Sequence, residues 1–264
     1  MSESARIRAV VSRTPDFARR LRDHAIGHGF DSLSDERSDV ARFGVDAHVY
    51  EYSTECSVES RAALVWSSAA PRSGLGEAYI ESRGLDASVL IERDAVRFDI
   101  NGNPVVALRN FVDGRIMNVV TRRRRVGELP KAPGLTGCHN IGSLVGRIDQ
   151  VTGDVVVVEG VVDSLTAIET FPGVAVCGAH SAGAMAALIE AAAIRVSVTG
   201  GVLWVVPHAD GHDGIPGAGE RAAITGGRAA MALGLELGRT LRIVDLGASE
   251  DLNDAWRAGW RWSP

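Results

Sequence analysis

The chain contains only three cysteines, one lysine and few aromatic residues, and it has no long apolar run. Cys56, Cys138 and Cys177 stand alone and far apart, which excludes a Cys-x-x-Cys zinc ribbon and a disulfide framework. No apolar run approaches the ~20 residues that span a bilayer, and the first residues lack the apolar core of a signal peptide. We therefore expect a cytoplasmic protein that has no membrane partner.

The formal net charge of −5 over 264 residues argues against a uniformly basic nucleic-acid binder. Charge is nevertheless unevenly distributed, because residues 105–147 carry eight basic residues against two acids. The basic residues are Arg109, Arg115, Arg122, Arg123, Arg124, Arg125, Lys131 and Arg147. Such a segment suits the binding of polyphosphate or of a nucleic-acid backbone. A solvated strand edge that discourages strand pairing is the alternative explanation of the same arginines.

Residues 154–163 contain four consecutive valines, followed by Glu159, Gly160 and Asp163. A β-branched run of this kind predicts a strand covered on both faces, as in the centre of a parallel sheet. Gly160 permits a sharp turn, and Asp163 then begins a helix. Glu159 and Asp163 would therefore lie where open α/β sheets bind ligands. An ordinary strand-to-helix turn with a capping acid would explain the same ten residues.

Strands and helices alternate after residue 150, which predicts parallel strands joined by crossover helices. The predicted strands are 173–177, 202–206 and 241–244, and the predicted helices are 184–193 and 219–235. Before residue 150, Asn101-Gly102 and Asp113-Gly114 separate the β-rich runs 95–100, 105–111 and 115–121 and predict two hairpins. Helical spacing recurs at 58–69 and 77–85.

Acidic residues recur at the ends of the predicted parallel strands. Glu159 and Asp210 each end or closely follow a strand, and Asp251 follows the last predicted strand. Because the carboxyl ends of parallel strands meet at one edge of the sheet, these carboxylates would repel one another unless a cation lay among them.

These residues resemble the toprim domain shared by bacterial DnaG-type primases, topoisomerases and several small nucleases. The resemblance is carried by Glu159-Gly160-x-x-Asp163, by His208-x-Asp210 and by Gly247-x-x-x-Asp251-Leu252-Asn253-Asp254. Among these families the chain is most similar to the primases of phages and plasmids. Their basic subdomain is matched by Ala78-Tyr79-Ile80-x-x-Arg83-Gly84-Leu85, by the arginine-bearing hairpin and by Lys131.

The resemblance implies an α/β fold in three parts. Residues 151–264 would form a parallel toprim-like (Rossmann-like) sheet. A small mixed α+β basic subdomain at 76–150 would precede it, and residues 1–75 would form a helical N-terminal region.

The implied activity is that of a metal-dependent nucleotidyltransferase, a DNA-directed RNA polymerase of the DnaG-type primase class. It would synthesise short RNA primers from nucleoside triphosphates on single-stranded DNA, with Mg²⁺ or Mn²⁺. The implied catalytic residues are Glu159 and Asp210. The implied metal ligands are Glu159, Asp163, His208, Asp210, Asp251 and Asp254. The implied nucleotide or nucleic-acid ligands are Arg109, Arg122, Arg124 and Lys131.

Two departures from the family pattern keep other functions open. His208 stands where the family has an aspartate, and histidine suits Mg²⁺ poorly although it can ligate Mn²⁺. Primases of this type also usually carry a zinc ribbon and often a helicase, and neither is encoded here. Template choice would then be relaxed or need another chain, and the expected protein partners are a helicase or a separate template-recognition protein. The alternatives are a toprim nuclease that cleaves nucleic acid, and a non-catalytic toprim-derived module that binds nucleic acid or a partner.

Overall fold

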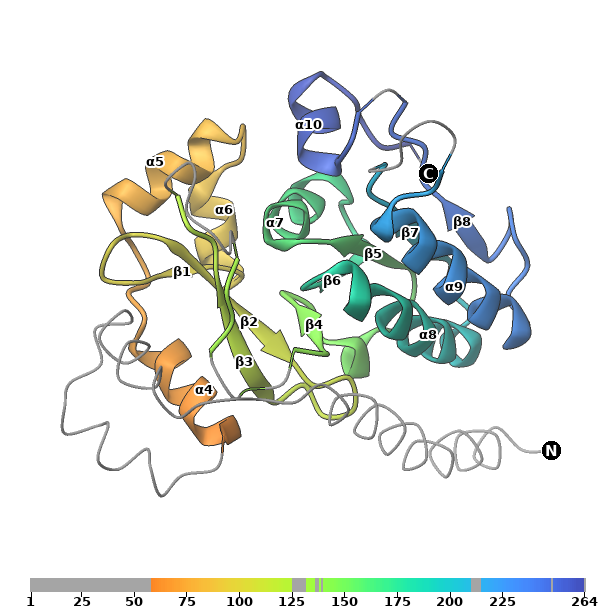
Figure 1. Ribbon diagram of the computed structural model, residues 1–264, viewed down its shortest axis with the longest axis horizontal. Helices are drawn as coiled ribbons and strands as arrows, with labels where there is room; N and C mark the ends of the chain where they lie inside the picture. Colours follow the sequence, from red (N-terminus) through yellow and green to blue (C-terminus); the bar gives the residue numbers. More distant parts are fainter. Residues whose placement is uncertain are drawn as a thin grey trace.

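The structure is a computed structural model that describes residues 58–124, 132–135, 138, 140–209, 215–247 and 249–263 (Figure 1). Two of the predicted site residues, Lys131 and Asp210, lie outside these ranges. Most of the helical region predicted for residues 1–75 also lies outside them.

The elements follow the predicted alternation of strand and helix. The helices are α4 (Val58–Ser68), α5 (Gly74–Ser82), α6 (Ala87–Glu92), α7 (Val161–Thr170), α8 (Ala182–Thr199), α9 (Ala218–Ala232) and α10 (Leu252–Arg257). The strands are β1 (Arg97–Phe98), β2 (Pro104–Arg109), β3 (Ile116–Thr121), β4 (Ser143–Leu144), β5 (Val155–Glu159), β6 (Ala175–Ala179), β7 (Leu203–Val206) and β8 (Leu241–Ile243). A short 3-10 helix, η2 (Ile148–Gln150), precedes β5.

One sheet runs through the described part of the chain, in the order β1-β2-β4-β6-β5-β7-β8, with β3 paired to β2. Strands β6, β5, β7 and β8 are parallel to their neighbours, whereas β1, β2, β3 and β4 form antiparallel pairs. The predicted α/β fold class, with a parallel central sheet and a smaller antiparallel part before it, is confirmed.

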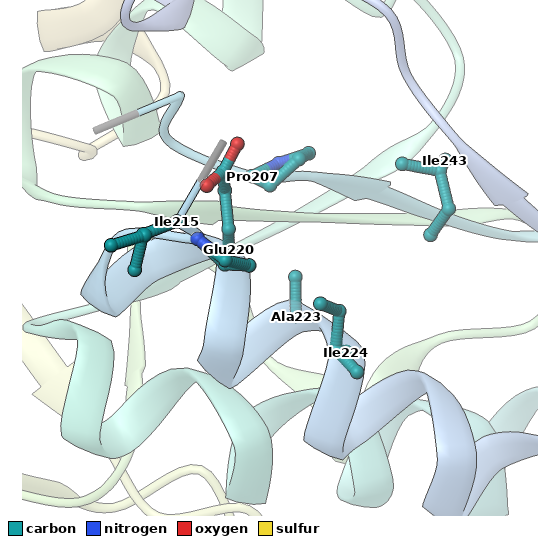
Figure 2. Close-up of a pocket in the computed structure, with 7 residues that line it drawn as sticks. Pro207, Ile215, Glu220, Ala223, Ile224 and Ile243 are labelled. Atoms are coloured by element: carbon teal, nitrogen blue, oxygen red, sulfur yellow. The ribbon is translucent and has the colours of Figure 1, made fainter. Parts of the chain in front are cut away.

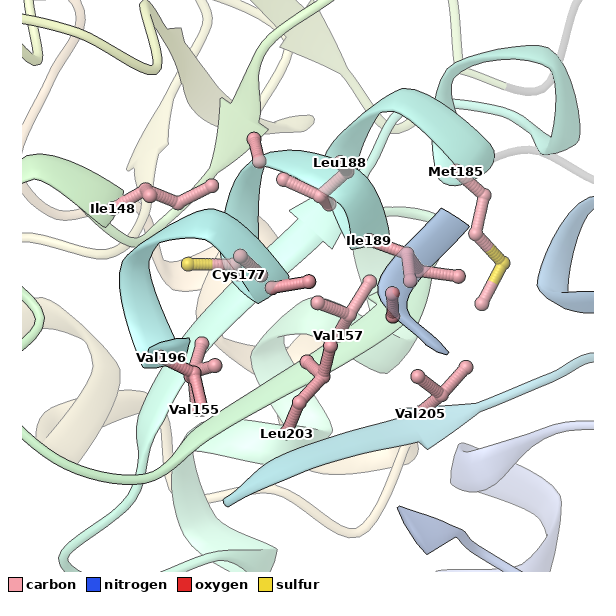
Figure 3. Packing of buried hydrophobic residues seen from close by; sticks show 14 of the residues in the cluster. Ile148, Val155, Val157, Cys177, Met185, Leu188, Ile189, Val196, Leu203 and Val205 are labelled. Atoms are coloured by element: carbon pink, nitrogen blue, oxygen red, sulfur yellow. The ribbon is translucent and has the colours of Figure 1, made fainter. Parts of the chain in front are cut away.

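The four valines of β5 contribute to the hydrophobic core on both faces of the sheet. Val155 and Val157 pack under α8 and α9 (Figure 3), and Val156 and Val158 pack on the opposite face, with residues of α7 and α10. All four side chains are fully buried, as predicted for a strand covered on both faces. Burying each one contributes about 2 kcal/mol relative to leaving it exposed, which makes β5 a rigid support for the acid at its end.

The two-residue strand β4 joins the antiparallel and parallel parts of the sheet. Leu144 pairs with Leu108 of β2 on one side and with Gly178 of β6 on the other. Helix α7 reinforces the junction, because Leu165 packs in one apolar cluster with Leu108 and Leu144. The hairpin of β2 and β3 is therefore fixed relative to the carboxyl ends of the parallel strands.

Several short elements were not predicted. Within the predicted strand 95–100, only Arg97–Phe98 pairs as β1, and α6, β4 and α10 have two to six residues each, too few for a periodic pattern. The boundary predicted after residue 75 falls inside α5. The helices predicted at 58–69 and 77–85 correspond to α4 and α5, and both hairpins are present.

Helix α8 is long and apolar enough to cross a membrane by length and composition, the one such helix in the described ranges. Its apolar residues, among them Met185, Leu188 and Ile189, pack against the sheet and against α9 (Figure 3). This burial is that of a core helix in a soluble-type α/β fold.

Candidate active site at the carboxyl edge of the sheet

Glu159 ends β5, and its half-buried carboxylate lies against the first turn of α9. A methyl group at Gly219 would lie 2.8 Å from Glu159 Oε2 and 2.9 Å from His208 Cβ. Only a glycine therefore allows the helix to approach this closely. The amino end of a helix carries partial positive charge, so the approach of α9 stabilises negative charge on Glu159.

Asp163, in the first turn of α7, is buried with 4% of its surface exposed. Its carboxylate accepts hydrogen bonds from the backbone N–H groups of Leu252 (3.3 Å) and Asn253 (3.0 Å). It also accepts one from His208 Nε2, at 2.8 Å. Asp163 thus ties the start of α10 and the end of β7 to α7, and both of its oxygens are engaged within the protein.

His208 follows β7 and pairs with Asp163. Burial of the imidazole opposes its protonated form. The hydrogen bond and charge of Asp163, with smaller contributions from Glu159 and Asp251, outweigh burial and raise the pKa of this imidazole to about 9. At neutral pH, His208 therefore supplies a positive charge among the carboxylates.

Asp251 is the N-cap of α10 and accepts a hydrogen bond from the backbone N–H of Asp254 at 2.7 Å. Burial, and then the charge of Asp163, raises the pKa of the Asp251 carboxyl. Asp254 has an exposed side chain, 4.0 Å from Arg257 on the surface of α10. Of these two acids, Asp251 faces the buried cluster and Asp254 faces solvent.

Glu159, Asp163, His208 and Asp251, here called the acidic edge, therefore lie together as their sequence positions predicted. A backbone hydrogen bond of 2.8 Å from Ala209 N–H to Glu250 O holds the loop after β7 beside the loop before α10. Among the described residues, no group of three or more His, Cys, Asp or Glu side chains is arranged to hold a metal ion. Neither Asp163 nor Asp254 is placed as a direct metal ligand. Both oxygens of Asp163 already accept hydrogen bonds, and Asp254 faces solvent beside Arg257.

The basic residues predicted to act together are divided between two ends of the β2–β3 hairpin. Arg109 pairs with Ile116 at one end, whereas Arg122 N–H bonds to Pro104 O at the other. Five residues of strand separate these ends, about 16 Å. Arg124 lies at the Pro104 end, where its guanidinium donates to Asn101 O at 2.6 Å. The predicted nucleotide or nucleic-acid ligands Arg109 and Arg122 therefore lie at opposite ends of the hairpin, because the strand register separates them.

Arg122 is linked to the acidic edge through α5. Its Nε donates to Tyr79 Oη at 3.2 Å, and the guanidinium of Arg83 lies 5.5 Å from the centre of the Tyr79 ring. The Arg83 carbonyl accepts from Asn253 Nδ2 at 3.0 Å, and the charge of Arg83 lowers the pKa of Asp251 against the effect of burial. Arg83 was not predicted as a site residue, although it belongs to the segment that resembles the primase basic subdomain.

His180, directly after β6, is a second residue that the sequence did not single out. Its Nε2 donates to Ala132 O at 2.8 Å. Ala132 is the next residue after Lys131 in the chain. The connector that carries the single lysine is thus attached to the same edge of the sheet that ends in Glu159, since Ala179 and Glu159 are paired.

An apolar pocket of about 440 Å³ lies beside this edge, between β7, β8 and α9 (Figure 2). Its walls include Pro207, Ile224 and Ile243, and its acid, Glu220, accepts from Gly217 N–H at 2.8 Å. Glu220 caps its own helix, and the other described residues that line the pocket supply mainly aliphatic surface, with no cation for phosphate among them.

No protein-family profile matches the chain, and no curated protein matches its sequence. Among solved structures, the primase fragment of the primase-helicase protein of bacteriophage T7 matches with a TM-score of 0.46 and 15% sequence identity. The match covers 68% of this chain and 68% of that fragment. It is a distant likeness of fold alone.

Proposed function

We propose that this chain is a primase-like, metal-dependent nucleotidyltransferase that makes short RNA on single-stranded DNA from nucleoside triphosphates. One observation carries the proposal. The acidic edge lies at the carboxyl ends of β5 and β7, and the Arg83–Tyr79–Arg122 contacts connect it to the arginine-bearing hairpin. A polymerase needs acids for metal ions close to a basic surface for phosphates, because it binds a triphosphate and a template at the same time.

A divalent cation, Mg²⁺ or Mn²⁺, would be held by Glu159, Asp251 and Asp210 and would neutralise the phosphate oxygens of the substrate. The chemistry of the two described carboxylates fits this role. The raised pKa of Asp251 reflects burial and an excess of negative charge that His208 only partly offsets, and a bound cation would relieve it.

Glu159 has a second role in this proposal, and the residues around the cation site have roles of their own. Glu159, held against α9, would accept the proton of the attacking hydroxyl. Asp163 and His208 would position the edge by fixing α10 and β7 to α7. Arg122 and Arg83, with Lys131 from the connector, would bind the triphosphate or the template backbone.

The test is to incubate the purified chain with labelled nucleoside triphosphates, single-stranded DNA and either Mg²⁺ or Mn²⁺. New oligonucleotides support the proposal. Shortened DNA would instead indicate a toprim nuclease. Retention of DNA with neither product would indicate a non-catalytic binding module. The His208–Asp163 ion pair favours this alternative, because His208 places an internal cation where the family has an aspartate. A helicase or a separate template-recognition protein, if one is required, would raise synthesis when it is added to this reaction.

Glu159→Gln is expected to reduce synthesis at least about a hundredfold, since it removes the proton acceptor without changing the size of the side chain. The matched control is Glu250→Gln, which removes an exposed charge next to Asp251. Circular dichroism would check that both variants remain folded. A Glu159→Gln variant as active as the control would exclude Glu159 from the mechanism.

A further inference from the structure

A second cluster of charge lies apart from the acidic edge, in a pocket of about 460 Å³ next to the amino end of β6. Arg93, Arg109 and Arg147 line it, together with Asp94. These arginines come from the end of α6, the end of β2 and the residue before η2, so three separate segments of the chain meet there. We call this site the arginine pocket.

Arg109 is half-buried in this pocket. Among the described residues its guanidinium has no carboxylate within 4 Å, and its hydrogen bond is to Gly114 O at 3.5 Å. Burial lowers the pKa of Arg109, the direction expected for a cation that is partly removed from water. Arginine nevertheless stays protonated. Arg109 therefore presents a charge for which the described part of the protein supplies no direct counter-ion.

The two other arginines differ in how firmly they are held. Arg147 bonds to Asp149 at 2.6 Å and to Asp113 O at 3.1 Å, which fixes its direction. Arg93 is exposed, donates to Ile168 O at 3.5 Å and, within the described ranges, has no carboxylate within 4 Å. The pocket thus combines one oriented guanidinium with two that have no described carboxylate within 4 Å, on which Asp94 and Glu169 act only at longer range.

Backbone strain is concentrated in the same place. Asp94 (φ +49°) and Val145 (φ +57°) are the non-glycine residues with positive φ in the described part of the chain. Both line the arginine pocket. For a β-branched residue such as Val145 this conformation is unfavourable, and strain of this kind is retained where the surrounding structure fixes a binding geometry.

We propose that the arginine pocket binds the phosphate groups of a nucleoside polyphosphate. Guanidinium groups bind phosphate through paired hydrogen bonds. The aliphatic wall of Val145, Val151 and Val176 suits the non-phosphate part of such a ligand, and the volume lies in the range of small-molecule sites. The inference does not rest on the proposed function. The pocket lies at the start of the parallel strands, whereas the acidic edge lies at their ends. Its residue Ala175 pairs with Val155 at the start of β5, and Glu159 lies four residues, or about 13 Å, further along that strand.

The test is calorimetric titration of the whole chain in EDTA, which suppresses cation-dependent binding at the acidic edge. The probes are ATP, pyrophosphate, adenosine and a twelve-residue oligothymidylate. Binding of ATP and pyrophosphate without binding of adenosine supports the proposal. Binding of the oligonucleotide alone would assign the pocket to a strand and overturn it, as would the absence of binding by all four probes.

Substitution then locates the site. Arg109→Gln is expected to weaken ATP binding about tenfold or more, and Arg93→Gln about threefold to tenfold, because each removes a charge-assisted hydrogen bond. Arg239→Gln, the control, removes a surface charge that pairs with Glu236 far from the pocket in sequence, and should leave binding within about twofold. Arg93 is exposed, so its variant remains informative even if Arg109→Gln impairs folding. Unchanged ATP binding in both pocket variants would overturn the proposal, and it would do so whether or not the chain makes primers.

Discussion

The acidic edge and the arginine pocket treat their charges in opposite ways. At the acidic edge, Asp163 accepts from two backbone N–H groups and from an imidazolium 2.8 Å away. In the arginine pocket, Arg93 and Arg109 have no carboxylate within 4 Å among the described residues. The acidic edge is neutralised partly from within. In the arginine pocket only Arg147 has a close acid, Asp149, and the described residues place no carboxylate within 4 Å of the other two arginines.

This difference predicts what each cluster contributes. Charges that are paired inside the fold connect elements, and the removal of one partner leaves the other buried without compensation. Charges without a close partner at exposed or half-buried positions add little stability and remain available to a ligand. Substitutions at the acidic edge should therefore change the free energy of unfolding, and substitutions in the arginine pocket should change binding.

The largest expected effect is at Asp163. Asp163→Asn keeps the size of the side chain but removes the charge that pairs with His208 and turns one acceptor into a donor facing backbone N–H groups. We expect the free energy of unfolding to fall by about 3–5 kcal/mol, as when one partner of a buried ion pair is removed. Denaturant titration followed by circular dichroism would measure it.

The control for this comparison is Asp254→Asn in the neighbouring helix α10. Asp254 is exposed and lies 4.0 Å from Arg257, so its loss should cost less than about 0.5 kcal/mol. Equal effects of the two substitutions would contradict the assignment of Asp163 as the anchor of α10.

A second effect should appear as a pH dependence. The pKa of His208 is about 9 in the folded protein against 6.5 for the unperturbed group. A raised folded pKa gives stability that is fully present below about pH 6.5 and is lost as the pH rises through about 9. The shift corresponds to about 3 kcal/mol. The free energy of unfolding, measured in EDTA, should therefore decrease as the pH is raised from about 6.5 to about 9.

His208→Gln identifies the source of that dependence. The difference in unfolding free energy between the parent and the variant should shrink as the pH rises. The parent loses the stabilisation by its imidazolium as that group deprotonates, whereas the variant has no imidazolium to lose. A difference that stays constant from pH 6 to 9 would show that His208 does not carry a raised pKa.

Much of the parallel sheet could be predicted from the sequence, because its strands are apolar and periodic. The four valines of β5 required burial on both faces, and the chain after Gly160 had to turn. Strand β4 could not be predicted, since a two-residue strand is defined by backbone pairing with β2 and β6 and not by side-chain type.

The site was predictable in position but not in detail. Glu159, Asp163, His208 and Asp251 meet because parallel strands end at one edge. Which of them would pair internally depends on the backbone N–H groups at the start of α10, which no sequence pattern reveals. The separation of Arg109 from Arg122 depends in the same way on strand register.

A third prediction contrasts two glycines of α9. A methyl group at Gly219 would lie 2.8 Å from Glu159 Oε2, whereas one at Gly227 would have its nearest contact at 4.0 Å. Alanine is favoured over glycine in a helix by about 1 kcal/mol, so Gly227→Ala should stabilise the protein by that amount. Gly219→Ala should instead destabilise it by about 1 kcal/mol, because Glu159 or the helix must move. Thermal unfolding of both variants would test the opposite signs, and a stabilised Gly219→Ala would show that α9 does not confine Glu159.

The smallest expected effect is at Asp94 in the arginine pocket. Asp94 faces the same pocket as Arg109, and its charge raises the pKa of that arginine. Asn is tolerated at the positive φ of this position. Arg97 Nε donates to Asp94 Oδ1 at 3.1 Å, and the Oδ1 of an asparagine can accept the same hydrogen bond. Asp94→Asn should therefore tighten pyrophosphate binding about threefold without loss of stability, because one repelling charge is removed at an exposed position.

Calorimetry would measure the change, with Asp254→Asn as the control because it removes an equal charge outside the pocket. Equal tightening in both variants would indicate that only net charge matters, and weaker binding in Asp94→Asn would indicate that Asp94 holds the arginines in place.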